Sequence, residues 1–175
     1  MNATTRPTQP ELCALHADID ARVAEIRTAQ PDWPCAKGCD ACCRRLAAVP
    51  QLTAGEWALL RGALAALPVG QLAQIEHRLS ALETRAPLTC PLLDEASGAC
   101  PVYAQRPVAC RTYGYYTQRD GGLYCGQIEA RVSTGQLDDV IWGNHDAIDR
   151  RLTRLGETRA LTDWFRDWRK ETPGA

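Results

Sequence analysis

Cysteine is the residue that most constrains how this chain can fold, since it occurs nine times in 175 residues. Eight of the nine fall into two groups. The early cysteines are Cys35, Cys39, Cys42 and Cys43, and the late cysteines are Cys90, Cys100, Cys110 and Cys125. The segment of residues 1–11 is polar and lacks the apolar core of a secretory signal, so we expect a cytoplasmic protein with reduced thiols. Such thiols are usually ligands or redox groups; a disulfide framework is the alternative in an oxidising compartment.

Charge and hydropathy exclude two classes of partner. The formal net charge is −1, which provides no basic field to attract nucleic acid or anionic lipid. No apolar run approaches the roughly 20 residues that a membrane helix needs. We therefore expect neither a nucleic acid nor a membrane as a partner, and a metal and a redox protein as the partners that remain.

Apolar residues recur at helical spacing in five stretches, so we expect helices there. The first helix is predicted over residues 9–30, and Thr53-Ala-Gly-Glu56 has the pattern of a capping box that opens the second. The second and third helices share one spacing and are expected to form an antiparallel hairpin. The apolar stripes are Leu12, Leu15, Ile19, Val23 and Ile26; Trp57, Leu60, Leu64 and Leu67; Leu72, Ile75, Leu79 and Leu82; Ile141, Ile148, Leu152 and Leu155; and Leu161, Trp164, Phe165 and Trp168.

Residues 87–126 have no such period and carry all four late cysteines. Few large aliphatic residues follow Leu93, so metal ligation is expected to offset the entropy of ordering this stretch. The fold class predicted is mainly α: one small helical domain of residues 1–175 around an irregular, cysteine-ligated metal-binding segment. Cys13 lies beside the first apolar stripe and is expected to be a small buried hydrophobic residue rather than a ligand.

Sulfur ligands suit zinc, copper(I) and iron–sulfur clusters. Zinc sites usually draw on close C-x₂₋₄-C pairs. The early cysteines have that spacing, but the late ones are separated by nine, nine and fourteen residues and supply no second close pair. One local group joined by distant cysteines is typical of iron–sulfur ligation. We therefore expect an iron–sulfur cluster of the [4Fe–4S] type, with zinc as the alternative.

Cys42 and Cys43 are adjacent, which limits how they can ligate. Neighbouring side chains point about 100° apart on a helix and to opposite faces of a strand, so both can rarely reach one small ion. The pair therefore indicates two metal positions, or one ligand and one redox thiol. Eight cysteines could form two four-thiolate sites, or one cluster and a thiol pair, and spacing alone does not choose.

Each group of cysteines is incomplete alone, so we expect early and late cysteines to ligate together.

Basic residues near the cysteines would offset thiolate charge and raise the reduction potential of a bound cluster. These residues are Lys37, Arg44, Arg45, Arg106 and Arg111. Lys37 and Arg45 are expected to be solvated, and Arg106 and Arg111 to have a structural or site role. His145 is expected to be a core histidine rather than a further ligand.

The residues around the cysteines form an ordered pattern. They run Cys35…Cys39-x₂-Cys42-Cys43, Cys90-Pro91-Leu92-Leu93-Asp94, Gly98-x-Cys100-Pro101-Val102-Tyr103, Arg106-Pro107 and Cys110-Arg111. This pattern resembles the YkgJ-like cysteine-cluster family over about residues 35–125, with helical extensions at either end. The resemblance implies zinc or iron chelation, or an iron–sulfur oxidoreductase. By position, it implies as metal ligands Cys35, Cys39, Cys42, Cys43, Cys90, Cys100 and Cys110, with Cys125 as the eighth and no counterpart for Cys13.

Four functions are compatible with these features. The first is an iron–sulfur protein with a redox or electron-transfer role, and the second is a zinc-stabilised interaction module. The third is a metal-handling protein. The fourth is a methylase-like enzyme, because larger proteins that resemble this chain around the cysteines methylate flagellin lysines, and because Cys35-x₃-Cys39-x₂-Cys42 has the spacing of radical S-adenosylmethionine enzymes. No Ser/His/Asp set, phosphate loop or carboxylate pair compels a hydrolase or a kinase, and the sequence identifies no catalytic residue.

Overall fold

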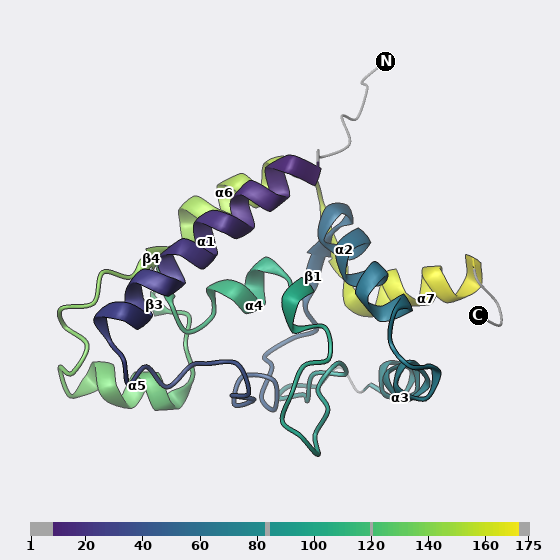
Figure 1. The fold of residues 1–175 in the computed structure, drawn as a ribbon, viewed down its shortest axis with the longest axis horizontal. Coiled ribbons are helices and arrows are strands. Elements are labelled where there is room, and N and C mark those ends of the chain that lie inside the picture. The colour runs from purple at the N-terminus through teal and green to yellow at the C-terminus, as the bar shows by residue number, and fades with distance from the viewer. Residues whose placement is uncertain (1–8, 83–84, 120, 172–175) are drawn as a thin grey trace. The chain divides into compact units, whose positions relative to one another are not determined.

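The computed structural model describes residues 9–82, 85–119 and 121–171, and in these ranges the chain is mainly α-helical, as predicted (Figure 1). Residues 1–8, which belong to the N-terminal segment in which no export signal was expected, lie outside the described residues. The helices are α1 (Gln9–Ala29), α2 (Ala54–Ala65), α3 (Val69–Ser80), α4 (Val108–Thr112), α5 (Gly126–Ser133), α6 (His145–Arg154) and α7 (Leu161–Glu171), with a 3₁₀ turn, η1, at Tyr103–Gln105. Five short strands are β1 (Gln51–Thr53), β2 (Tyr116–Gln118), β3 (Gly121–Gly122), β4 (Gly143–Asn144) and β5 (Thr158–Ala160). No helix in these ranges is both long enough and apolar enough to span a bilayer.

The chain folds into two compact units, each assembled from two separate segments. The first unit contains the residues up to Cys39 together with Val108–Gly156. The second unit contains Asp40–Pro107 together with the residues from Glu157 onward. The boundary therefore passes through the run of early cysteines.

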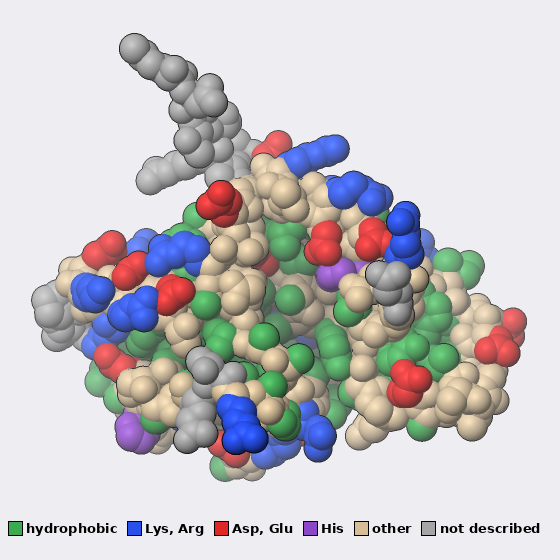
Figure 2. Space-filling model, turned by 180° about the vertical axis from the view of Figure 1, so that it is seen from behind, with side chains coloured by type: hydrophobic (Ala, Val, Ile, Leu, Met, Phe, Trp, Pro, Cys, Tyr) green, Lys and Arg blue, Asp and Glu red, His purple; other side chains and the backbone are tan. Residues whose placement is uncertain are grey.

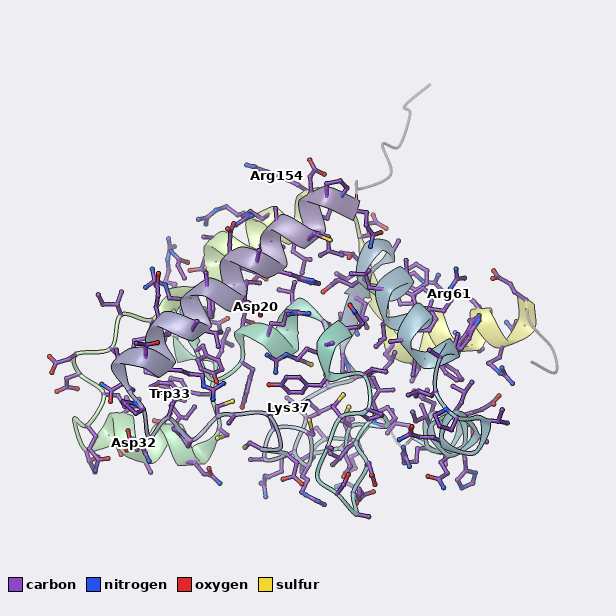
Figure 3. The ribbon with its side chains drawn as sticks, viewed as in Figure 1. Asp20, Asp32, Trp33, Lys37, Arg61 and Arg154 are labelled. Carbon is purple, nitrogen blue, oxygen red and sulfur yellow. The ribbon has the colours of Figure 1, made fainter. Side chains whose placement is uncertain are left out.

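In the first unit, α1 packs against α4 and α6, and the short strands form a three-stranded sheet in the order β3-β2-β4. The apolar stripe predicted for α1 is its packed face, since Leu12, Leu15 and Ile19 are almost completely buried. Arg111 of α4 donates to both carboxylate oxygens of Asp20 on α1, at 3.0 and 2.9 Å. Figure 3 labels Asp20 on the side of α1 that faces α4. The ion pair gives Arg111 the structural role that the sequence allowed.

The second unit is built on α2, which begins with the predicted capping box. Thr53 accepts a hydrogen bond from the Glu56 backbone N–H, and the Glu56 side chain accepts one from the Thr53 backbone. β1 pairs antiparallel with β5, which leads directly into α7. One hydrophobic core joins α2, α3, the loop after Cys90 and α7; it includes Trp57, Leu60, Leu64, Ile75, Leu79, Leu93, Leu161, Phe165 and Trp168.

Three expectations differ from the structure. Cys13 is exposed on α1, because it lies just outside the buried stripe that begins at Leu12. Ile141 is 75% exposed and precedes α6, so it does not belong to the stripe of Ile148 and Leu155. α2 and α3 do not form an antiparallel hairpin: Figure 1 shows α3 nearly end-on, whereas α2 is seen from the side.

Candidate metal centre

The two units divide the eight candidate ligands equally. We call the four in the first unit the first cysteine set, and the four in the second unit the second cysteine set. The first set is Cys35, Cys39, Cys110 and Cys125, and the second is Cys42, Cys43, Cys90 and Cys100. Each set combines two early cysteines with two late ones. All nine cysteines lie in the described part of the chain, and no disulfide joins any two of them there.

The thiols of the second set lie close together. The sulfur atoms of Cys42 and Cys43 are 4.0 Å apart, although adjacent side chains were expected to diverge. The tight turn at residues 41–45, in which the Arg44 backbone N–H donates to the Asp40 carbonyl at 3.0 Å, brings them to the same side. Cys43 in turn shares a hydrogen bond with the Cys90 thiol and lies within electrostatic range of Cys100.

Backbone hydrogen bonds hold this set in place. The Cys90 N–H donates to the Cys43 carbonyl at 2.7 Å, and an antiparallel bridge joins Leu46 to Leu88. The chain between Cys90 and Cys100 then reverses in a turn that is closed by the bridge between Asp94 and Ala99. The turn that follows Cys43 and the loop that carries Cys90 and Cys100 are thereby fixed together by main-chain contacts.

Asp94 shapes the turn that returns the chain to Cys100. Its carboxylate accepts hydrogen bonds from the Ser97 hydroxyl at 2.5 Å and from the Ala96 N–H at 3.2 Å. These bonds hold the pKa of Asp94 below its ordinary value, the Ser97 bond most of all. Gly98 completes the turn with a φ of 68°, which glycine adopts without strain. Asp94 and Gly98 belong to the cysteine pattern of the sequence, but their role in this turn could not be predicted from it.

Proximity and burial raise the pKa of three second-set thiols, Cys42, Cys43 and Cys100, when no metal is present. The hydrogen bond with Cys43, followed by burial, raises the pKa of Cys42 far above its ordinary value. For Cys43 the bond with Cys42 lowers the pKa, but the Cys90 bond, burial and the neighbouring thiols outweigh it and raise the pKa to about 12. Burial also raises the pKa of Cys100, while the nearby Arg106 guanidinium acts in the opposite direction. A bound cation that favours thiolate would therefore displace protons here.

The first set is organised around Cys35. The Tyr115 hydroxyl donates a hydrogen bond to the Cys35 carbonyl. A Cβ atom built on Gly114 would lie 3.1 Å from the Cys35 sulfur. The Gly114 backbone N–H also donates to the Leu123 carbonyl at 2.6 Å. Leu123 lies two residues before Cys125, which immediately precedes α5. Cys35 is thus adjacent to the loop whose two ends carry Cys110 and Cys125. Gly114 and Tyr115 were missed from sequence, where only a glycine within a run of tyrosines marked them.

The basic residues near the cysteines differ in role. The Arg106 guanidinium stacks 4.0 Å from the centre of the Tyr103 ring and partly offsets the rise that burial causes in the pKa of Cys100. Arg44 is held by carboxylates instead, at 2.6 Å from Asp40. Lys37 and Arg45 are exposed, as expected, and Figure 3 labels Lys37. On the face that Figure 2 shows, basic and acidic side chains are interspersed.

His145 is the first residue of α6 and lies one turn before the buried Ile148, on the same face of the helix. Its side chain is 15% exposed, and its Nε2 lies 3.3 Å from the Asp149 carboxylate. Its Nδ1 is buried and has no hydrogen-bond partner among the described residues. His145 is therefore largely buried, as predicted, but only one of its two ring nitrogens has a partner in the described part of the chain.

The donor chemistry of the second set fits a thiophilic metal. Two thiolates on one tetrahedral ion, with metal–sulfur bonds of about 2.3 Å, stand about 3.8 Å apart, close to the 4.0 Å between Cys42 and Cys43. Among residues 9–82, 85–119 and 121–171, no three Cys, His, Asp or Glu side chains already have the arrangement of a metal site. Side-chain rotation within each set would have to accompany binding.

Comparison with known proteins agrees with the cysteine pattern. The family model CxxCxxCC, described as "Putative zinc- or iron-chelating domain", matches residues 34–132. Comparison with curated proteins and with solved structures finds no match. The matched region covers more than half of the chain and contains every cysteine of both sets, whereas Cys13 lies outside it. The chain therefore belongs to the CxxCxxCC family of zinc- or iron-chelating domains.

Proposed function

We propose that this protein carries an iron–sulfur cluster on its cysteines and exchanges electrons with a redox partner. The observation that carries the proposal is the second cysteine set, in which thiols from distant parts of the chain meet at the edge of a hydrophobic core. Thiolates are the protein ligands of iron–sulfur clusters. The cluster, when bound, supplies reversible one-electron chemistry.

The surroundings of the second set support a redox role. Cys90 is 9% exposed and belongs to the core, while Cys43 and Cys100 are half-buried and pack against it. The core excludes water from one side of the set, and the exposed side lets an electron pass to a partner. Arg106 places positive charge near Cys100, which stabilises thiolate and favours the reduced form of an anionic centre.

The distance between the Cys42 and Cys43 sulfur atoms helps to distinguish between types of iron–sulfur cluster. In a [4Fe–4S] cluster four cysteines are shared among four irons, one each, whereas each iron of a [2Fe–2S] cluster takes two. Cys42 and Cys43, at 4.0 Å, are spaced for ligation of one metal atom. This spacing supports a [2Fe–2S] cluster over the [4Fe–4S] cluster expected from sequence.

Zinc is the second candidate, and the same 4.0 Å separation favours it, because a structural zinc ion takes four thiolates at one tetrahedral point. The protein would then be an interaction or metal-handling module without redox chemistry. The two candidates differ in a property that is measured directly, since zinc is colourless and does not change oxidation state.

Anaerobic purification of the full chain tests the proposal. Elemental analysis should give iron and acid-labile sulfide, the visible spectrum should bleach with dithionite, and the reduced protein should give an EPR signal. Cys13→Ser should leave the spectrum unchanged because Cys13 is exposed and outside the matched region. Colourless protein with stoichiometric zinc would replace the redox role with the zinc role, and protein that binds neither metal would refute both.

A further inference from the structure

We propose that the first and second cysteine sets are two independent four-thiolate sites, and that each holds its own centre of a thiophilic metal. The inference rests on the proposed metal-binding function and adds the number of centres and the ligands of each. The inference depends on one observation: each of the two compact units contains four of the eight cysteines. Four thiolates complete a structural zinc site, and four also complete an iron–sulfur cluster.

The thiols of the second set interact with one another. Cys43 interacts with Cys42, with Cys90 and with Cys100, and Cys100 interacts with Cys42. Cys43 and Cys100 also pack against the core that contains Cys90, and the Cys42 sulfur lies 4.0 Å from that of Cys43.

The first set has its own framework. Cys35 is fixed by Tyr115 and lies against Gly114, and the Cys39 N–H donates to the Ala36 carbonyl at 3.0 Å in the turn that follows. That turn passes through Gly38, whose φ of 96° favours glycine. Beyond Gly114, the hydrogen bond to the Leu123 carbonyl leads to Cys125 at the start of α5.

This assignment divides the early run of cysteines in an unexpected place. Cys39 and Cys42 have the C-x₂-C spacing that usually serves one ion. The unit boundary nevertheless falls between them, at Asp40, and the vicinal pair Cys42 and Cys43 stays together. The assignment also resolves the earlier difficulty that neither group of cysteines is complete, because each set takes two members from each group.

Cobalt(II) titration of the metal-free, reduced full chain tests the number of sites, because tetrahedral Co²⁺–thiolate centres absorb strongly. Wild-type protein and the control Cys13→Ser should bind two Co²⁺ per chain. Cys100→Ser, from the second set, and Cys125→Ser, from the first, should each lose about half of the thiolate-to-cobalt absorbance and keep one tight site. The double variant Cys100→Ser/Cys125→Ser should lose both sites. The double variant Cys90→Ser/Cys100→Ser, with both changes in one set, should lose little more cobalt absorbance than Cys100→Ser alone.

Alkylation followed by mass spectrometry identifies the ligands. In Co²⁺-loaded Cys125→Ser, the four thiols of the second set should be protected, while Cys35, Cys39 and Cys110 should react. Circular dichroism confirms that each variant is folded; if Cys125→Ser unfolds, Cys39→Ser takes its place. One Co²⁺ per wild-type chain, or complete loss of binding in both single variants, would show one mixed centre and overturn the inference. A wild-type chain that binds no metal at all would instead refute the proposed function.

Discussion

Replacing Gly114 with alanine tests the position of Cys35 in the first set. Gly114 has a φ of 87°, and its added methyl group would lie 3.1 Å from the Cys35 sulfur and 3.3 Å from the Cys35 Cβ. The left-handed backbone costs a residue with a side chain about 1–2 kcal/mol. Crowding a packed site costs a further 1–3 kcal/mol or so. The free energy of unfolding should therefore fall by about 2–5 kcal/mol.

Gly38→Ala is the matched control, because its φ of 96° carries the same backbone strain while nothing lies within 4 Å of the added methyl group. Its free energy of unfolding should fall by only about 1–2 kcal/mol. Gly156→Ala, with a φ of 125° and open space, repeats the control far from the cysteines in sequence. The entropy that alanine removes from the unfolded chain is common to all three and cancels in the comparison.

Urea unfolding of the metal-free, reduced protein, followed by tryptophan fluorescence, measures these differences. The Co²⁺ affinity of the first set should also fall in Gly114→Ala, because the Cys35 sulfur must move. The reasoning fails if Gly114→Ala and Gly38→Ala are equally stable, since the crowding against Cys35 would then be absent.

Three further predictions concern stability. Thr53→Ala should lower the free energy of unfolding by about 1–2 kcal/mol through loss of the capping box, and Thr53→Ser should restore most of it; equal losses would contradict the cap. Burial, aided by the Arg111 charge, lowers the pKa of His16 in the folded protein to about 4. The unfolded chain therefore takes up a proton first as pH falls below about 6.5, and the free energy of unfolding should drop by roughly 1–2 kcal/mol by pH 4, after allowance for partial exposure. His16→Gln should remove this part of the pH dependence, and an unchanged stability profile would refute it. Removing the metal should lower amide protection between residues 87 and 126, as hydrogen exchange would show, and unchanged protection there would contradict a folding role for ligation.

Local patterns predicted local structure well. The stripe of α1 and the capping box at Thr53 are confirmed because both depend on residues within a few positions of one another. The pairing of β1 with β5 could not be predicted, since strands of three residues are too short to show a period and their partners are more than 100 residues apart.

The candidate ligands could be named from sequence, but not sorted. Spacing alone allowed Cys39 to pair with Cys42 as readily as with Cys35, because C-x₂-C and C-x₃-C both lie within the range that metal sites use. The grouping depends on long-range packing, such as the bridge between Leu46 and Leu88 that brings Cys43 to Cys90. The approach of the Cys42 and Cys43 sulfurs likewise depends on a turn, which neither the helix rule nor the strand rule describes.

The interleaved order of the two units has a consequence for synthesis. The first unit needs the segment that begins at Val108, and the second needs β5 and α7 to complete its core. A nascent chain that has reached Pro107 thus holds an unfinished version of both. Each unit can therefore complete its packing only after its second segment has been translated. Synthesis of α7 must precede completion of the core beside Cys90.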